Sequence, residues 1–171
     1  MDQEELRNQL ERLHKKSYGW ALHCCSSDRV MAEDVLQSAY LKVLEGKANF
    51  EGRSEFPTWL FAVIKRTALE FFRRKRLTFF LSISERGDGA MTETPETAIH
   101  QSNLEAILRA ALETLSARQR EILHLVFYQD LSLSQAAEVL GISLGSARTH
   151  YERGKQRIRQ WLEKSYVAHE L

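Results

Sequence analysis

The 171-residue sequence has few of the residues that break or cross-link a chain: two prolines, eight glycines and two cysteines. The cysteines, Cys24 and Cys25, are adjacent, and neighbouring residues rarely meet the geometry of a disulfide. No stretch approaches the roughly 20 apolar residues of a membrane span, and the charged N-terminal segment lacks the apolar core of a secretion signal. We therefore expect reduced thiols, no insertion into a membrane, and a cytoplasmic protein.

The sequence also lacks a large excess of positive or negative charge, since its net charge is only +1. The charge is nevertheless unevenly distributed. Residues 62–77 hold six basic residues and one acidic residue, and residues 144–164 hold six basic and two acidic residues. Two basic segments in a nearly neutral chain indicate two separate anion-binding surfaces.

Apolar residues recur at helical rather than alternating spacing, which predicts an all-α fold. One stripe runs from Ala32 to Val43 and a second from Leu60 to Phe72. Between them and the C-terminal part, residues 82–98 are rich in Ser, Thr, Gly and acid and contain Pro95, a composition typical of a flexible linker. We expect two small helical bundles, residues 1–77 and 104–171, joined by a linker at 78–103.

The C-terminal part carries the start and stop signals of a helix-turn-helix. Ser116 and Ser132 are each followed three residues later by a glutamine, the spacing of a capping box at a helix start. Gly141 supplies the positive φ that ends a helix, and the small Ala137 lets two helices cross closely. The alternative is a plain helical hairpin with a solvated basic face. Caps, turn, small crossing residue and basic face together favour DNA binding.

The N-terminal part adds motifs that a DNA-binding module alone does not need. The chain reads AEDVLQ at 32–37, a Phe- and Gly-containing loop at 49–56, TWL at 58–60 and FFRRKR at 71–76. In this order and spacing the series resembles region 2 of bacterial sigma factors of the extracytoplasmic-function (ECF) class. Residues 115–150 resemble both the C-terminal domain of sigma factors and the output domain of LuxR-type regulators, so the N-terminal motifs decide between the two.

The resemblance implies a sigma factor that binds core RNA polymerase, reads promoter DNA at its −35 and −10 elements and supports strand opening. It also implies an anti-sigma factor, often membrane-anchored in this class. By motif match, polymerase binding falls to Asp34, Gln37 and Leu41. Duplex contacts at −35 fall to Arg148, Thr149, Glu152, Arg153, Lys155 and Arg157. Contacts at −10 fall to Asn49, Phe50, Gly52, Arg53, Ser54, Trp59, Lys65, Arg66, Arg73 and Arg74.

Physical chemistry agrees with these roles. Arginine can donate two bonds to guanine, threonine can contact a base or a thymine methyl, and glutamate can accept from cytosine. A glycine-containing loop with Phe, Asn, Arg and Ser can hold an extruded base. For Phe50, Phe56 and Trp59 the alternative is core packing. The chain departs from the family pattern at Ser38, Ala62, Arg66, His150 and Gly154, which affects contact details, and Gly154 should cost its helix about 1 kcal/mol.

Three other functions remain as alternatives. A LuxR-like regulator would bind a palindrome as a homodimer. A zinc- or redox-active protein would use His14, His23, Cys24 and Cys25, but their spacing matches no common metal motif, so buried thiols are the better interpretation. The basic and aromatic segment FFRRKRLTFFL at 71–81 could bind a membrane surface. We expect no catalytic residue, cofactor or metal, and hence no enzyme.

Overall fold

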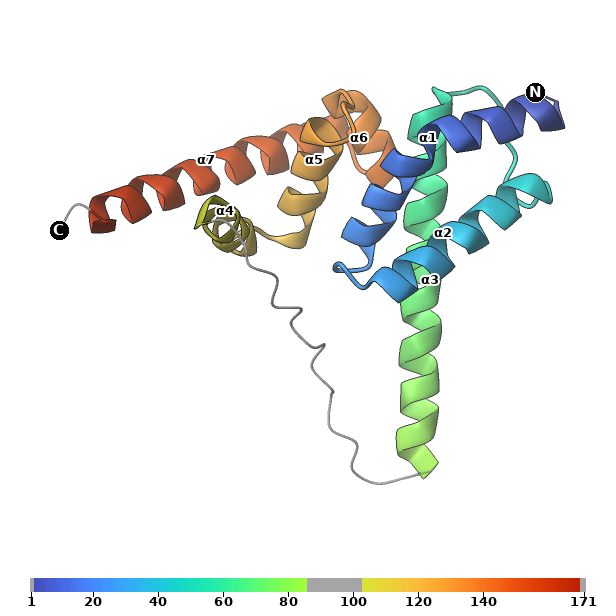
Figure 1. Ribbon diagram of the computed structural model, residues 1–171, viewed down its shortest axis with the longest axis horizontal. Helices are drawn as coiled ribbons and strands as arrows, with labels where there is room; N and C mark the ends of the chain where they lie inside the picture. Colours follow the sequence, from blue (N-terminus) through green and yellow to red (C-terminus); the bar gives the residue numbers. More distant parts are fainter. Residues whose placement is uncertain (1, 86–102, 170–171) are drawn as a thin grey trace.

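A computed structural model describes residues 2–85 and 103–169 of the chain, with side chains described at 2–76 and 108–164. Within these residues the chain forms seven α-helices and no strand, which confirms the predicted all-α fold (Figure 1). None of these helices, within the described part of the chain, is long and apolar enough to cross a membrane.

The first three helices form one unit: α1 (Gln3–Cys24), α2 (Arg29–Leu44) and α3 (Phe56–Glu85). Asp2 and Asp28 start the first two, each carboxylate accepting a hydrogen bond from a backbone N–H of the first turn, at 2.7 and 3.0 Å. The predicted stripe of α2 is buried against α1 and α3. The fully buried Trp20 joins α1 to α3, because its indole Nε1 donates to the carbonyl of Phe61 at 3.0 Å.

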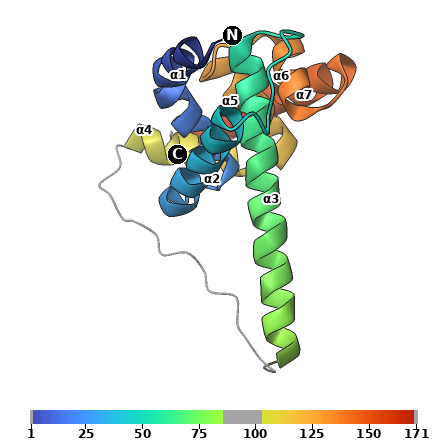
Figure 2. The same ribbon diagram turned by 90° about the vertical axis from the view of Figure 1, so that its right-hand side faces the viewer.

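Helix α3 continues to Glu85, eight residues beyond the expected domain end at residue 77. The sequence offers a reason, since neither glycine nor proline lies between Pro57 and Gly87 to interrupt the helix. Figures 1 and 2 show the C-terminal part of α3 extending away from the other helices. Residues 86–102 of the expected linker lie outside the described residues.

The remaining helices are α4 (Asn103–Glu113), α5 (Ala117–Phe127), α6 (Leu133–Leu140) and α7 (Leu144–His169). Both predicted capping boxes are formed, at Ser116 on α5 and Ser132 on α6. Gly141 ends α6 with a φ of 62°, and the Ser143 hydroxyl then accepts from the Ser146 N–H at 3.1 Å to start α7. Helices α6 and α7 are therefore the predicted helix-turn-helix.

The two groups of helices pack directly on each other. Helix α3 contacts α6 and α1 contacts α5, so the buried side chains of both parts form one continuous apolar cluster (Figures 1 and 2). The sequence pattern predicts the helices within each unit. It does not predict this contact between the units, because the residues that make it are more than 50 positions apart.

Candidate functional site

The outward face of α7 carries the residues expected to read DNA. Arg148, Thr149, Glu152, Arg153 and Arg157 are exposed and Lys155 is half-buried. On the opposite side apolar residues hold the helix to the unit, most tightly at the fully buried Ala147. Further along the helix Leu162 is 42% exposed, because the C-terminal part of α7 runs beyond the bundle (Figure 1).

Several of these side chains have partners within α7 itself. The Thr149 hydroxyl donates to the carbonyl of Gly145 at 3.0 Å. The ammonium of Lys155 lies 3.5 Å from the Glu152 carboxylate and 4.7 Å from the centroid of the Tyr151 ring. Exposed pairs of this kind stabilise by about 0–1 kcal/mol, so a DNA phosphate or base edge can replace them at little cost.

Gly154 has a packing role that the sequence pattern does not reveal. A Cβ at this buried position would lie 3.0 Å from Cδ1 of Leu123 and 3.4 Å from Cβ of Gln119. The glycine therefore lets α7 approach α5 closely. The close packing of α7 on α5 offsets the cost of glycine to helix propensity.

The loop before α3 presents the polar residues expected at the −10 element. Asn49, Gly52 and Arg53 are exposed and Ser54 is half-buried. Gly52 has a φ of 71°, a conformation that other residues rarely adopt. Arg53 is paired with the neighbouring Glu51 at 2.7 Å, with both side chains largely in solvent. This loop has the backbone freedom and the hydrogen-bonding groups that capture of a base requires.

Three aromatic rings pack together at the base of this loop. Phe50, Phe56 and Trp59 have pairwise centroid distances of 5.3–5.4 Å, and Phe56 is buried at 8% exposure. Phe56 is therefore a core residue, one of the two interpretations left open by the sequence. Phe50 and Trp59 are only partly buried, so their rings both support the loop and reach the surface.

The basic segment of α3 is not uniformly accessible. Arg66, Arg73 and Arg74 are exposed. Lys65 differs, because its side chain is only 13% exposed and forms an ion pair with Glu121 of α5, itself 12% exposed. In this arrangement the Lys65 ammonium is not accessible to DNA. A DNA phosphate would have to displace the Glu121 carboxylate inside the contact between the two units.

A second surface lies on α2, opposite the side packed against α1 and α3. Asp34 and Gln37 are exposed, and Leu41 is 49% exposed. Val30 at 72% and Leu44 at 36% extend the same face, since all five follow a 4-3-4-3 spacing. Val30 and Leu44 were not among the residues expected from the sequence. Their heptad spacing with the motif residues was the available signal for a helix-docking face.

The cysteines and histidines of the N-terminal unit are arranged for packing. Burial raises the pKa of Cys24 to about 12 and that of Cys25 to about 11, so both thiols stay protonated at neutral pH and are poor nucleophiles. His23 stacks on Trp20 and on His124 of α5, with centroid distances of 5.3 and 4.3 Å. Within the described residues no group of three His, Cys, Asp or Glu side chains could hold a metal ion.

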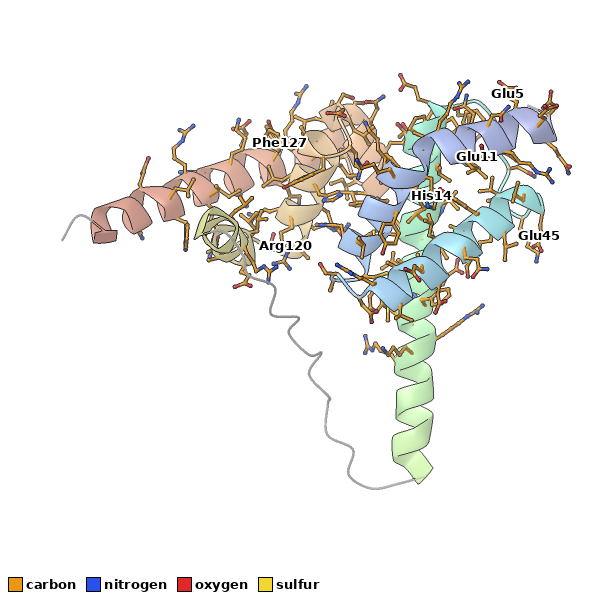
Figure 3. All side chains as sticks on the ribbon, in the orientation of Figure 1. Glu5, Glu11, His14, Glu45, Arg120 and Phe127 are labelled. Atoms are coloured by element: carbon orange, nitrogen blue, oxygen red, sulfur yellow. The ribbon has the colours of Figure 1, made fainter. Side chains whose placement is uncertain are left out.

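His14 and Phe127 lie apart from this stack. Figure 3 places His14 on α1, where its ring is 6.1 Å from that of Tyr40 on α2. It places Phe127 on α5 beside α7, where Phe127 stacks on Tyr151 at 6.1 Å. The four residues His14, His23, Cys24 and Cys25 therefore do not converge on one site.

Comparisons with known proteins match both units. Residues 10–78 match the model of Sigma-70 region 2, and residues 111–160 match that of Sigma-70 region 4. The chain is 30% identical over 136 residues to the RNA polymerase sigma factor YlaC of Bacillus subtilis, covering 78% of this chain and 79% of that protein. It is also 30% identical over 143 residues to the ECF RNA polymerase sigma factor SigX of Bacillus subtilis, covering 80% of this chain and 73% of that one.

A solved structure shares the arrangement of helices. The sigma factor RpoE from Bartonella quintana, in complex with the anti-sigma factor NepR, superimposes with a TM-score of 0.68 at 24% identity, covering 93% of this chain and 97% of that one. This likeness supports the all-α fold with both helical units.

Proposed function

The chain belongs to the ECF RNA polymerase sigma factors, and we propose how its two helical units divide the recognition of a promoter. As a sigma factor it directs promoter-specific transcription initiation. A LuxR-like regulator is not favoured, because the match includes region 2 as well as the helix-turn-helix. We assign region 2 to residues 1–77, the linker to 78–103 and region 4 to 104–171.

Helix α7 reads the −35 element as duplex DNA. The observation that carries this assignment is the exposed face of Arg148, Thr149, Glu152 and Arg153 immediately after a capped turn, as in a recognition helix lying in the major groove. Arg148 and Arg153 can each donate two hydrogen bonds to a guanine. Lys155 and Arg157 lie further along the helix and contact phosphates.

The loop before α3 and the basic face of that helix hold the −10 element as a single strand. Asn49, Gly52, Arg53 and Ser54 offer hydrogen bonds and close backbone approach to an extruded base. Phe50 and Trp59 provide ring faces for stacking. The phosphates of the strand are bound by Arg66, Arg73 and Arg74, and by Lys65 once its ion pair with Glu121 is broken. The protein performs no chemical step itself.

The α2 face binds core RNA polymerase. Asp34 and Gln37 supply polar contacts, and Val30, Leu41 and Leu44 supply apolar contacts, a mixture typical of the surface of a helix that packs on partner helices. The protein works in the cytoplasm with polymerase. An anti-sigma factor regulates it, as in the complex of NepR with the sigma factor RpoE, which shares its fold.

The test is binding with and without core polymerase. A sigma factor should co-purify with core enzyme and bind promoter DNA tightly only in that complex. Tight binding by the free protein, as a homodimer on a palindromic site, would instead identify a conventional regulator.

A further inference from the structure

We propose that Phe127 and Arg159 extend the DNA-binding surface of the helix-turn-helix beyond the face of α7 described above. The Phe127 ring packs on a deoxyribose of the DNA backbone at the edge of the −35 element, and Arg159 binds a nearby phosphate. The inference rests on the proposed function, because it adds two contacts to the same promoter element.

The C-terminal end of α5 carries two consecutive exposed aromatic side chains. Phe127 is 60% exposed and Tyr128 is 62% exposed. The two rings contact different parts of the unit, since Phe127 stacks on Tyr151 of α7 at 6.1 Å, whereas Tyr128 stacks on His124 of α5 at 5.2 Å. Of the two, Phe127 is therefore the ring that lies beside the recognition helix, as Figure 3 shows.

Tyr151 connects Phe127 to a positively charged side of α7. The Lys155 ammonium lies 4.7 Å from the centroid of the Tyr151 ring. Arg148 lies three residues before Tyr151, and Arg159 lies four residues after Lys155, so the three cations share one side of the helix. Arg148 and Arg159 are exposed and Lys155 is half-buried. An exposed apolar ring thus adjoins, through Tyr151, a basic flank of α7 formed by Arg148, Lys155 and Arg159.

The backbone of duplex DNA fits this surface in charge and in position. Its deoxyribose rings offer apolar contact between anionic phosphates, which matches an aromatic ring beside a row of cations. The basic flank is also continuous with the face of α7 proposed to lie in the major groove, because Arg148 belongs to both. That groove is about 12 Å wide and is bordered by a sugar–phosphate strand on each edge. The side of a helix inserted in it therefore faces a backbone.

Glu152 competes with a phosphate for Lys155. Its carboxylate lies 3.5 Å from the Lys155 ammonium, and the two side chains are 68% and 39% exposed. An exposed pair of this kind stabilises little, so a phosphate can take the place of the carboxylate. Among the residues whose side chains are described, Arg159 forms no ion pair. Its guanidinium can bind a phosphate without breaking an existing contact.

The experiment measures how tightly holoenzyme, assembled from core RNA polymerase and the full chain, binds a promoter fragment at several salt concentrations. Phe127→Ala should bind about fivefold more weakly, as expected for the loss of a partly buried apolar contact. The slope of log affinity against log salt should not change, because the lost contact is uncharged. The loss should also be the same for every −35 sequence, since sugar contacts do not read bases. A residue that merely positioned α7 would change the preference for −35 bases instead.

Three further variants sharpen the result. Tyr128→Ala is the matched control, because it removes an equally exposed ring from the next position and should bind DNA like the wild type. Phe127→Tyr keeps a ring and should also bind normally. Arg159→Gln should reduce the salt slope by about 1, the change expected for one lost phosphate contact. If Phe127→Ala fails to fold by circular dichroism, Phe127→Gln replaces it with the same expected results.

Wild-type affinity of Phe127→Ala for the promoter, or an equal loss in Tyr128→Ala, would overturn the contact of Phe127 with DNA. Weaker binding of Phe127→Ala to core polymerase without DNA would also overturn it, because the surface would then bind protein. An unchanged salt slope for Arg159→Gln would remove the phosphate contact. The proposed function is tested separately by Arg148→Ala and Arg153→Ala, which should weaken promoter binding whatever Phe127→Ala does.

Discussion

The two basic surfaces of the molecule have similar net charge but different accessibility. The outward face of α7 is mostly exposed from Arg148 to Arg157 and begins directly after a capped helix start. The basic face of α3 is divided, with Arg66 in solvent and Lys65 paired inside the contact between the units. A local sequence pattern thus predicts which residues a helix presents, whereas tertiary packing decides which of them a ligand can reach.

The largest effect should come from Trp20, which joins α1 to α3 and touches α5. Trp20→Ala removes a fully buried ring and its hydrogen bond to Phe61, and should cost about 3–5 kcal/mol in unfolding free energy. Urea denaturation followed by circular dichroism measures it. Trp20→Phe keeps most of the apolar contact and should lose less. An unchanged midpoint for Trp20→Ala would show that the N-terminal unit does not depend on this residue.

The exposed surface of α7 can be tested by Arg148→Ala and Arg153→Ala. Each should cost about 1–3 kcal/mol of holoenzyme binding to a promoter with guanine in its −35 element, without a change in thermal stability. Arg12→Ala, which removes an exposed arginine of α1, is the control. Normal promoter binding by both α7 variants would refute the recognition-helix assignment.

The α2 face should be sensitive to Asp34→Ala. We expect core polymerase binding to weaken by about 1–2 kcal/mol, as for a charged contact at an interface, with an unchanged melting temperature because Asp34 is exposed. Glu4→Ala on α1 removes an exposed carboxylate away from this face and should have no effect. Co-purification of Asp34→Ala with polymerase at the wild-type level would remove this residue from the binding face.

The folded protein should lose stability in mild acid. Burial lowers the pKa of His23 to about 4 and that of His124 to about 3. Glu121 acts in the opposite direction on the pKa of His23, while Lys65 and Arg120 add to the lowering. A lowered pKa in the folded state means that folding is favoured while both rings are neutral, above their ordinary pKa of about 6.5, and that this stability is progressively lost as the pH falls below that value. At pH 6 the free energy of unfolding should fall by about 1 kcal/mol per histidine.

Urea denaturation followed by circular dichroism at pH 7.5, 6.5 and 5.5 checks this prediction. His124→Phe keeps a ring in the stack but cannot be protonated, so its free energy of unfolding should change less with pH. A wild type whose free energy of unfolding is constant over this range would contradict the histidine contribution to stability.

The smallest effect is expected at Gly154, on the side of α7 opposite the proposed DNA-binding face. Gly154→Ala gains about 1 kcal/mol of helix propensity but brings a methyl group to 3.0 Å from Leu123 Cδ1, so the two effects should nearly cancel in thermal melting. Gly154→Leu cannot be accommodated in the same way and should be clearly destabilising. Equal stability of the two variants would show that α7 does not need this close approach.

Much of the fold was predictable from local signals. The capping boxes at Ser116 and Ser132, the turn at Gly141 and the buried stripe of α2 all follow from short-range spacing and are confirmed. The continuation of α3 to Glu85 was missed because composition suggested a linker from residue 78. Local patterns also could not show that Gly154 faces Leu123, since helix propensity contains no information about a neighbouring helix.

The helix faces of the candidate site were predictable from the sequence, but the contacts between the two units were not. The exposed residues of α7 and the α2 face follow from helical periodicity and motif order, although Val30 and Leu44 were overlooked. The pairing of Lys65 with Glu121 could not be predicted, because it depends on how two separate helical units meet. The base and polymerase contacts assigned to these residues stay predictions.

In vitro transcription with purified core polymerase on a pool of genomic promoter fragments tests the proposed function most directly. We expect initiation that depends on this protein, from start sites sharing a −35 and a −10 element, with Arg148→Ala and Arg153→Ala reducing it at the guanine-bearing −35 sites. Initiation that is no greater with the protein than with core polymerase alone, or start sites that share no such pair of elements, would contradict it.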